Sequence, residues 1–141
     1  PMLSCEHPAL RVLVVDDHEL TRYSLHLAFS AQENIEIVAL ASNGKEAIDM
    51  VECHHPDVIV LDLQMPMMDG LSAATRIKSL EPDTKIIAYS SVEDPQIEVM
   101  SQTAPVDIFC RKDVATSDLI NLVRKMGSSK LNHLEPLAKI S

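Results

Sequence analysis

The stretch Val58-Ile59-Val60-Leu61-Asp62 consists of four consecutive aliphatic residues followed by a carboxylate. A short apolar run of this kind is typical of a strand that is buried on both faces of a parallel sheet. Three further runs also end in polar residues: Leu13-Val14-Val15 before Asp16 and Asp17, Ile86-Ile87-Ala88-Tyr89 before Ser90, and Ile108-Phe109-Cys110-Arg111 before Lys112. If these runs are neighbouring parallel strands, three carboxylates, a hydroxyl and an ammonium group meet at one edge of the sheet.

The apolar runs alternate with longer segments that have the periodicity of helices, which predicts βαβ units around a parallel sheet. Strands are expected near residues 10–15, 35–41, 57–62, 85–90 and 106–111. A parallel sheet usually has helices packed on both of its faces. The sequence therefore predicts the α/β class, with a doubly wound, five-stranded parallel sheet.

The apolar positions of the first and last helices predict which of their sides are buried. The first helix should begin near residue 18 or 19 and turn Leu20, Tyr23 and Leu27, with Phe29 or Ala28, toward the sheet. The last helix should begin at residue 116 or 117 and end before Gly127, because glycine commonly terminates helices.

The three helices between them are predicted from their start and stop signals. The second should begin at residue 43 or 44, with Ser42 or Asn43 as its N-cap. The third should begin at Asp69-Gly70 and stop before Pro82, which cannot continue a helix. A fourth helix, with a weaker apolar pattern, is expected within residues 92–103.

A chain of 141 residues is long enough for one domain with its own hydrophobic core and too short for two of ordinary size. The predicted strands and helices place that domain at residues 10–126. Residues 1–9 are then an N-terminal extension, and residues 127–141 are a C-terminal tail or linker.

Composition narrows the classes of function. The net charge of −9 disfavours binding to nucleic acids and anionic membranes, and with only 3% aromatic residues there is little for base stacking. Three cysteines without a close pair indicate free thiols in a reducing compartment, so a cytoplasmic location is expected. No apolar run approaches the length that spans a bilayer, so no membrane association is expected.

The polar residues at the strand ends predict a metal site with phosphoryl chemistry. Ligands of open parallel sheets bind at the carboxyl ends of the strands. Clustered carboxylates repel one another without a cation, and a site of oxygen ligands suits Mg²⁺. Beside a metal and an ammonium group, Asp62 is the best placed nucleophile for a phosphoryl group, while Ser90 and Lys112 could hold the phosphoryl oxygens.

Residues 10–126 closely resemble the receiver domain of two-component response regulators, which has a flavodoxin-like (βα)5 fold. The stretch Val14-Val15-Asp16-Asp17-His18 and the stretch Asp62-Leu63-Gln64-Met65-Pro66-Met67-Met68-Asp69-Gly70 carry the resemblance, the second matching the family signature D-x-x-M-P-x-M-D-G. Ser90 and Lys112 complete the family's five active-site positions, at intervals that the family uses.

The resemblance implies a role for each of these residues. Asp62 would accept a phosphoryl group from a sensor histidine kinase or a phosphotransfer protein. The protein would catalyse only the phosphorylation and dephosphorylation of its own Asp62, so it is not expected to be an enzyme that acts on other substrates. Mg²⁺ would be bound by Asp17, Asp62 and the backbone carbonyl of Gln64, with Asp16 acting through water. Ser90 and Phe109 would form a switch pair that reports phosphorylation to the surface of the fourth helix and fifth strand.

Asp17-His18 and Lys112-Asp113 are most similar to the NarL/FixJ subclass, whose output domain is a LuxR-type helix-turn-helix. This implies control of transcription, possible homodimers, and DNA binding only through an output domain that these 141 residues do not contain. One segment departs from the family: Pro105-Val106-Asp107-Ile108-Phe109 stands where Gly-Ala-x-Gly-Tyr is usual. The departure leaves open a second interpretation, a degenerate or stand-alone receiver that acts as a protein-interaction module.

Overall fold

The computed structural model describes residues 9–65, 70–91 and 105–133, with side chains described as far as Ser128. The elements in chain order are β1 (Leu10–Val15), α1 (Glu19–Ser30), β2 (Ile35–Ala41), α2 (Gly44–His54), β3 (Val58–Leu61), α3 (Gly70–Leu80), β4 (Lys85–Ser90), β5 (Ile108–Arg111) and α5 (Thr116–His133). The predicted fourth helix, most of the N-terminal extension and residues 66–69 of the signature lie outside the described residues.

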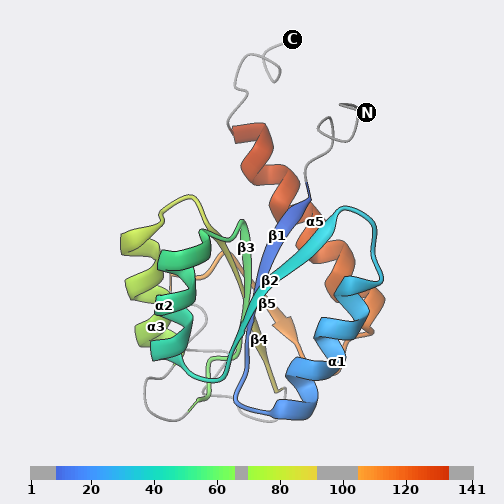
Figure 1. Cartoon of the computed structure of the whole chain (residues 1–141), viewed down its shortest axis with the longest axis horizontal. Coiled ribbons are helices and arrows are strands. Elements are labelled where there is room, and N and C mark those ends of the chain that lie inside the picture. Colours follow the sequence, from blue (N-terminus) through green and yellow to red (C-terminus); the bar gives the residue numbers. More distant parts are fainter. Residues whose placement is uncertain (1–8, 66–69, 92–104, 134–141) are drawn as a thin grey trace.

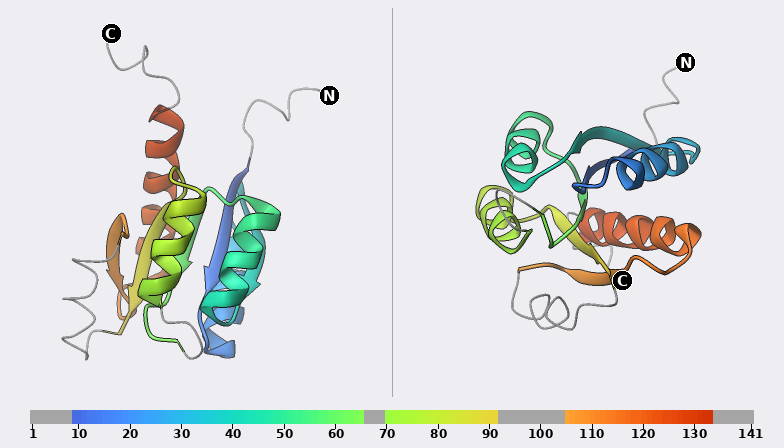
Figure 2. Two further views of the ribbon diagram at one scale, coloured as in Figure 1. Left: turned by 90° about the vertical axis from the view of Figure 1, so that its left-hand side faces the viewer. Right: turned by 90° about the horizontal axis from the view of Figure 1, so that it is seen from below.

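The five strands form one parallel sheet in the order β2-β1-β3-β4-β5. Helices α2 and α3 cover one face, and α1 and α5 cover the other (Figures 1 and 2). The predicted α/β class and doubly wound sheet are confirmed. Because the strand order reverses beside β1, the connections after β1 and β3 diverge at the carboxyl ends of the strands, where such sheets bind ligands.

Successive residues of β3 point to opposite faces of the sheet and so divide the core in two. Ile59 and Leu61 belong to the cluster under α2 and α3, while Val58 and Val60 belong to the cluster under α1 and α5. All four are fully buried. The apolar run that indicated a strand in the sequence is thus apolar because both of its faces are covered.

The prediction for the buried side of α1 is wrong for Leu20, Tyr23 and Leu27 and is confirmed for Phe29. Leu20, Tyr23 and Leu27 are 77%, 58% and 54% exposed, whereas Leu25 and Phe29 are buried against the sheet. The helix carries two apolar stripes on nearly opposite sides, and periodicity alone does not rank them. The stripe with Phe29 is buried because its ring fills the space beside β1 and β2, within the cluster under α1 and α5.

The expected end of the last helix is also wrong, since α5 continues through Gly127 to His133. A Cβ atom at Gly127 would lie 2.3 Å from Cδ1 of Leu10, so the missing side chain makes room for the start of β1. A glycine inside a helix costs only about 1 kcal/mol, which the contact with Leu10 can offset. The glycine is therefore a packing position, not a helix terminator.

The start of α2 follows the sequence prediction and settles which residue is the cap. Oδ1 of Asn43 accepts a hydrogen bond from the backbone N–H of Glu46 at 2.9 Å. In return, the Glu46 carboxylate accepts hydrogen bonds from the backbone N–H and the hydroxyl of Ser42. These two hydrogen bonds lower the pKa of Glu46, the backbone one most. The arrangement resembles a capping box and fixes the chain between β2 and α2.

At the opposite edge of the sheet, at the amino ends of the strands, two aspartate side chains accept hydrogen bonds from neighbouring strands. The Asp57 carboxylate, before β3, accepts the N–H of Arg11 at 3.0 Å. The Asp107 carboxylate, before β5, accepts the N–H of Ile86 at 2.7 Å, and Nζ of Lys78 lies 2.8 Å from the same oxygen. Asp107 stands at the variable position of the segment Pro105–Phe109, and its contacts join the start of β5 to β4 and α3.

In the part of the chain that the structure describes, no helix has the length and apolar character needed to cross a bilayer.

Candidate functional site

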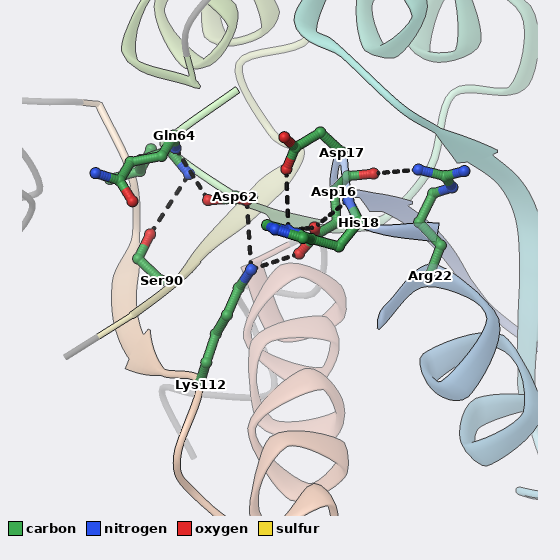
Figure 3. A network of polar contacts seen from close by, with 9 residues as sticks. Asp16, Asp17, His18, Arg22, Asp62, Gln64, Ser90 and Lys112 are labelled. Carbon is green, nitrogen blue, oxygen red and sulfur yellow. Dashed lines mark hydrogen bonds and ion pairs between the residues drawn. The ribbon is translucent and has the colours of Figure 1, made fainter. Parts of the chain in front are cut away.

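The carboxyl ends of four strands bring the polar residues singled out in the sequence to one place (Figure 3). Asp16 and Asp17 follow β1, Asp62 follows β3, Ser90 is the last residue of β4, and Lys112 follows β5. The backbone holds these ends in register, because the Asp62 N–H donates to the carbonyl of Val15 and the Lys112 N–H donates to that of Ser90. These hydrogen bonds tie the residues after β3 and β5 to the neighbouring strands.

The ammonium group of Lys112 lies between two buried carboxylates. Its Nζ is 2.7 Å from Oδ2 of Asp16 and 3.3 Å from Oδ2 of Asp62. Burial lowers the pKa of Lys112, but the hydrogen bond to Asp16 and the charge of Asp62 outweigh burial and raise the pKa above its ordinary value. Lys112 is thus held protonated, as a fixed positive charge beside Asp62.

The carboxyl group of Asp62 has a raised pKa. The residue is only 3% exposed, and burial, followed by repulsion from Asp16, raises its pKa to about 6, although the Gln64 N–H and Lys112 act in the opposite direction. The Gln64 N–H donates to Oδ1 of Asp62 at 2.9 Å and so orients the carboxylate. A carboxyl group of raised pKa in a site of mixed charge is typical of functional positions.

Asp16, Asp17, His18 and Asp62 form a group whose potential ligand atoms all lie within 4.8 Å of one another. Oδ2 of Asp16 is buried 2.7 Å from the ammonium group of Lys112, whereas the buried Oδ1 of Asp17 accepts no hydrogen bond and lies 3.1 Å from Nδ1 of His18. A buried carboxylate oxygen without a hydrogen bond favours the binding of a cation. The carboxylate oxygens of this group fit a hard divalent ion such as Mg²⁺.

His18 joins the site, although the sequence indicated only that it starts a helix. Its backbone N–H donates to Oδ1 of Asp16 at 2.9 Å, and its Nδ1 lies 3.1 Å from both Asp16 Oδ1 and Asp17 Oδ1. The side chain does not cap α1. The signal that could have identified it is its position directly after two strand-end carboxylates, which leaves its ring at the same edge of the sheet.

Ser90 is fully buried beneath the site. Its Oγ lies 3.4 Å from the backbone N–H of Leu63, in the loop that follows Asp62. This contact is long for a hydrogen bond to a hydroxyl oxygen, so the serine holds the loop loosely. The Ser90 hydroxyl accepts this hydrogen bond, so its own hydrogen can be donated to another acceptor group near the loop.

Gly70 supports the loop after Asp62 from the start of α3. Its N–H donates to the carbonyl of Leu63 at 3.0 Å, and a Cβ atom on it would lie 2.3 Å from Cα of Leu63 and 2.5 Å from the carbonyl oxygen of Asp62. The sequence marked this glycine as a helix start. The structure shows that it is needed for the close approach of two backbone segments, which no local signal reveals.

Phe109 lies in β5, away from the carboxylates, and packs partly buried against the cluster under α2 and α3. It also borders a surface cavity of about 440 Å³ between β5 and α5, with Cys110, Val114 and Leu122 among the lining residues. The fourth helix, the other half of the predicted switch surface, is outside the described residues.

The chain matches known proteins over most of its length. The family model of the response regulator receiver domain matches residues 12–124. The response regulator protein VraR of Staphylococcus epidermidis is 38% identical over 118 residues, which are 83% of this chain and 56% of that protein. This chain therefore spans about half the length of the curated relatives that it matches.

Solved structures agree with this assignment. The receiver domain of a putative NarL from Mycobacterium tuberculosis is 30% identical, with a TM-score of 0.79 over 86% of this chain and 98% of that one. The CheY of a CheX-CheY-BeF3-Mg²⁺ complex from Borrelia burgdorferi is 25% identical, with a TM-score of 0.74 over 84% and 89%. The resemblance to NarL-like regulators is confirmed. The chain belongs to the response regulator receiver family.

Proposed function

We propose that this chain is a phosphoacceptor: Asp62 takes a phosphoryl group from the phosphohistidine of a sensor histidine kinase or a phosphotransfer protein. The observation that carries the proposal is the buried Asp62 carboxylate, whose Oδ2 lies 3.3 Å from the ammonium group of Lys112 and next to Asp16 and Asp17. Membership in the receiver family supports it.

In the proposed reaction, an oxygen of Asp62 attacks phosphorus. The new P–O bond forms as the P–N bond to the donor histidine breaks, and the electron pair of that bond remains on the histidine nitrogen, which takes up a proton. The catalytic contribution of this chain is positioning and charge, because phosphoryl transfer needs its equatorial oxygens neutralised. Lys112, 3.3 Å from Oδ2 of Asp62, would bind those oxygens together with Ser90, and the Gln64 N–H would orient the nucleophile.

The site would hold Mg²⁺ through Asp17, Asp62 and the backbone carbonyl of Gln64, with Asp16 acting through water. When bound, the ion would supply positive charge to the oxygens of the transferred group. The buried Oδ1 of Asp17, which accepts no hydrogen bond, supports this role. The related CheY described with BeF3 and Mg²⁺ supports it as well.

Phosphorylation would be reported to the rest of the protein through Ser90 and Phe109. A phosphoryl group on Asp62 would draw the Ser90 hydroxyl away from the Leu63 N–H, and Phe109 would move into the space behind it. The affected surface would be β5 and the fourth helix. We infer control of transcription as the output, through a homodimer and a DNA-binding domain outside the region that these 141 residues share with their relatives.

Beyond its own phosphorylation and dephosphorylation, no catalytic activity is proposed for this chain. Cytoplasmic action fits the two free thiols among the described residues, Cys53 and Cys110. The second interpretation, a degenerate receiver that works only as an interaction module, rests on the segment Pro105–Phe109. The complete set of Asp17, Asp62, Ser90 and Lys112 favours the phosphoacceptor.

Incubation with phosphoramidate and Mg²⁺, followed by intact-mass measurement, separates the two interpretations. The wild type should gain the mass of one phosphoryl group, and Asp62→Asn should gain none. Asp113→Asn, which changes an exposed carboxylate paired with Arg111, is the matched control and should be modified like the wild type. An unmodified wild type, or an adduct that persists in Asp62→Asn, would overturn the phosphoacceptor assignment.

A further inference from the structure

The imidazole ring of His18 occupies an unusual position in the acidic cluster. Its Nδ1 is equidistant from two carboxylate oxygens, at 3.1 Å from Oδ1 of Asp16 and 3.1 Å from Oδ1 of Asp17 (Figure 3). Together with Asp62, these residues form the group whose potential ligand atoms are mutually within 4.8 Å. The set therefore contains one nitrogen donor among carboxylate oxygens.

The backbone around His18 holds the ring in this place. The His18 N–H donates to Asp16 Oδ1 at 2.9 Å, and the His18 carbonyl accepts the N–H of Arg22 at 3.0 Å in the first turn of α1. The guanidinium group of Arg22 also donates to the carbonyl of Asp16 at 2.7 Å. Residues 16 to 18 are thus fixed between β1 and α1, with the imidazole on the side of the carboxylates.

Packing does not explain the ring position. The His18 side chain is 68% exposed, belongs to neither hydrophobic cluster and makes no capping hydrogen bond to α1. Asp16 already has the Lys112 ammonium group 2.7 Å from its Oδ2, whereas the buried Oδ1 of Asp17 accepts no hydrogen bond. The ring is therefore directed at a carboxylate oxygen, Oδ1 of Asp17, to which the described residues donate no hydrogen bond.

The spacing suits neighbouring ligands of one metal ion. Ligands that are adjacent on an octahedral ion, with bonds of about 2.1 Å, lie roughly 3 Å apart. Nδ1 of His18 has this separation from Oδ1 of Asp17, a carboxylate that would bind the ion directly in the proposed site. Imidazole nitrogen is a good ligand for divalent iron, nickel and zinc, whereas Mg²⁺ takes oxygen ligands almost exclusively.

We propose that Nδ1 of His18 is a metal ligand of this site, and that it gives the site a preference for nitrogen-binding divalent transition metals over Mg²⁺. The inference rests on the metal site of the proposed function and adds a residue that determines which ion is bound. Replacement of His18 should change the affinity for a transition metal much more than the affinity for Mg²⁺.

The test uses Co²⁺ as the probe, because its paramagnetism shifts the proton resonances of a ligated imidazole. Co²⁺ and Mg²⁺ affinities are measured by calorimetry on the whole chain, for the wild type and for His18→Gln. We expect the variant to bind Co²⁺ about tenfold or more weakly, and Mg²⁺ within about twofold of the wild type. The wild-type Co²⁺ complex should show a strongly shifted imidazole resonance that is missing from the variant.

Two control variants locate the ion. Asp17→Asn should weaken both metals, since this carboxylate belongs to the same ligand group. His55→Gln changes an exposed imidazole paired with Glu81, distant in the fold from the acidic cluster, and should leave both affinities and the shifted resonance unchanged. Retention of Co²⁺ affinity in Asp17→Asn would place the ion elsewhere and overturn the proposal.

An equal change in both affinities in His18→Gln, or no change in either, would also overturn the proposal. So would tighter Mg²⁺ binding in the variant without loss of Co²⁺, because His18 would then be only a counter-ion that competes with the metal. Phosphorylation of the wild type is measured in parallel with Mg²⁺. A failure there concerns the phosphoacceptor assignment, while the ratio of metal affinities tests His18 alone.

Discussion

The two edges of the sheet use the same side chain in opposite ways. At the amino ends of the strands, Asp57 and Asp107 accept hydrogen bonds from strand N–H groups, and Asp107 also pairs with Lys78. At the carboxyl ends, Asp16 and Asp62 share the single ammonium group of Lys112, and the buried Oδ1 of Asp17 accepts no hydrogen bond. At the amino ends, the carboxylates have hydrogen-bond donors within the protein and so contribute stability. At the carboxyl ends, one carboxylate oxygen has no donor among the described residues, and this edge can bind ligands.

This comparison explains why the functional site lies at the carboxyl ends of the strands, here called the carboxyl edge, and not at the amino ends, the amino edge. Burial and repulsion from Asp16 raise the pKa of Asp62 to about 6, so ionised Asp62 makes the folded protein less stable. A cation or a phosphoryl group can relieve this unfavourable arrangement. At the amino edge no such opportunity exists, because each aspartate already has its donors.

The largest expected effect tests how closely two backbone segments pack together at the carboxyl edge. Gly70→Ala introduces a Cβ within 2.5 Å of the Asp62 carbonyl oxygen and nearer still to Leu63, both rigid backbone. We expect urea denaturation to show a loss of about 3 kcal/mol in the free energy of unfolding, together with slower phosphorylation. In the matched control, Gly127→Ala, the new Cβ meets only the movable end of Leu10, and the change should stay within about 1 kcal/mol. Equal losses in both variants would contradict this account.

The next effect tests the amino edge. Asp107→Ala leaves the N–H of the buried Ile86 without its side-chain hydrogen-bond acceptor, and it removes the carboxylate that forms an ion pair with Lys78. The free energy of unfolding should fall by about 2 kcal/mol. Asp113→Ala removes an exposed ion pair with Arg111 and should change it by less than about 0.5 kcal/mol. If Asp107 behaves like Asp113, the amino edge does not contribute stability as we describe.

At the carboxyl edge, removal of a carboxylate should increase the free energy of unfolding. The folded pKa of Asp62, about 6, is above its ordinary value of 3.8, so the folded state binds more protons between these values and loses stability as the pH rises through them. Asp62→Asn cannot ionise. In EDTA at pH 8 its free energy of unfolding should exceed that of the wild type by about 1–2 kcal/mol, and the difference should vanish near pH 4. A variant less stable than the wild type at pH 8 would reverse the comparison.

The smallest effect concerns the exposed side of α1, which begins next to the carboxyl edge. Leu20→Ser should change the free energy of unfolding by less than about 0.5 kcal/mol, because the side chain is largely exposed. Leu25→Ala, on the buried side of the same helix, should cost about 3 kcal/mol. Thermal unfolding of the two variants checks both values, and a large loss in Leu20→Ser would show that this side is covered in solution.

Much of the fold could be predicted because its signals are local. The runs at residues 10–15, 35–41 and 85–90 form strands with the expected bounds, and Asn43 caps α2 as one of the two expected candidates. The strands around residues 57–62 and 106–111 are shorter than predicted at their ends, where Asp57 and Asp107 use their side chains to bind neighbouring strands.

The candidate site was predictable for a similar reason. In a parallel sheet all strands end at the same edge, so residues that follow strands must come close together. This argument finds Asp16, Asp17, Asp62, Ser90 and Lys112, which the structure brings together. It does not find His18 or the role of Gly70, because neither ends a strand: the His18 ring contacts the two aspartates just before it, and Gly70 makes room for the backbone of the loop after Asp62.

The sequence by itself determined the alternation of strands and helices and the set of polar residues at the carboxyl edge, since both follow from neighbours along the chain. Tertiary structure decided which side of α1 is buried, why α5 continues past Gly127, and that Lys112 bridges Asp16 and Asp62. It also raised the pKa of Asp62. These properties depend on burial and on contacts between residues far apart in the chain, and only the folded molecule specifies them.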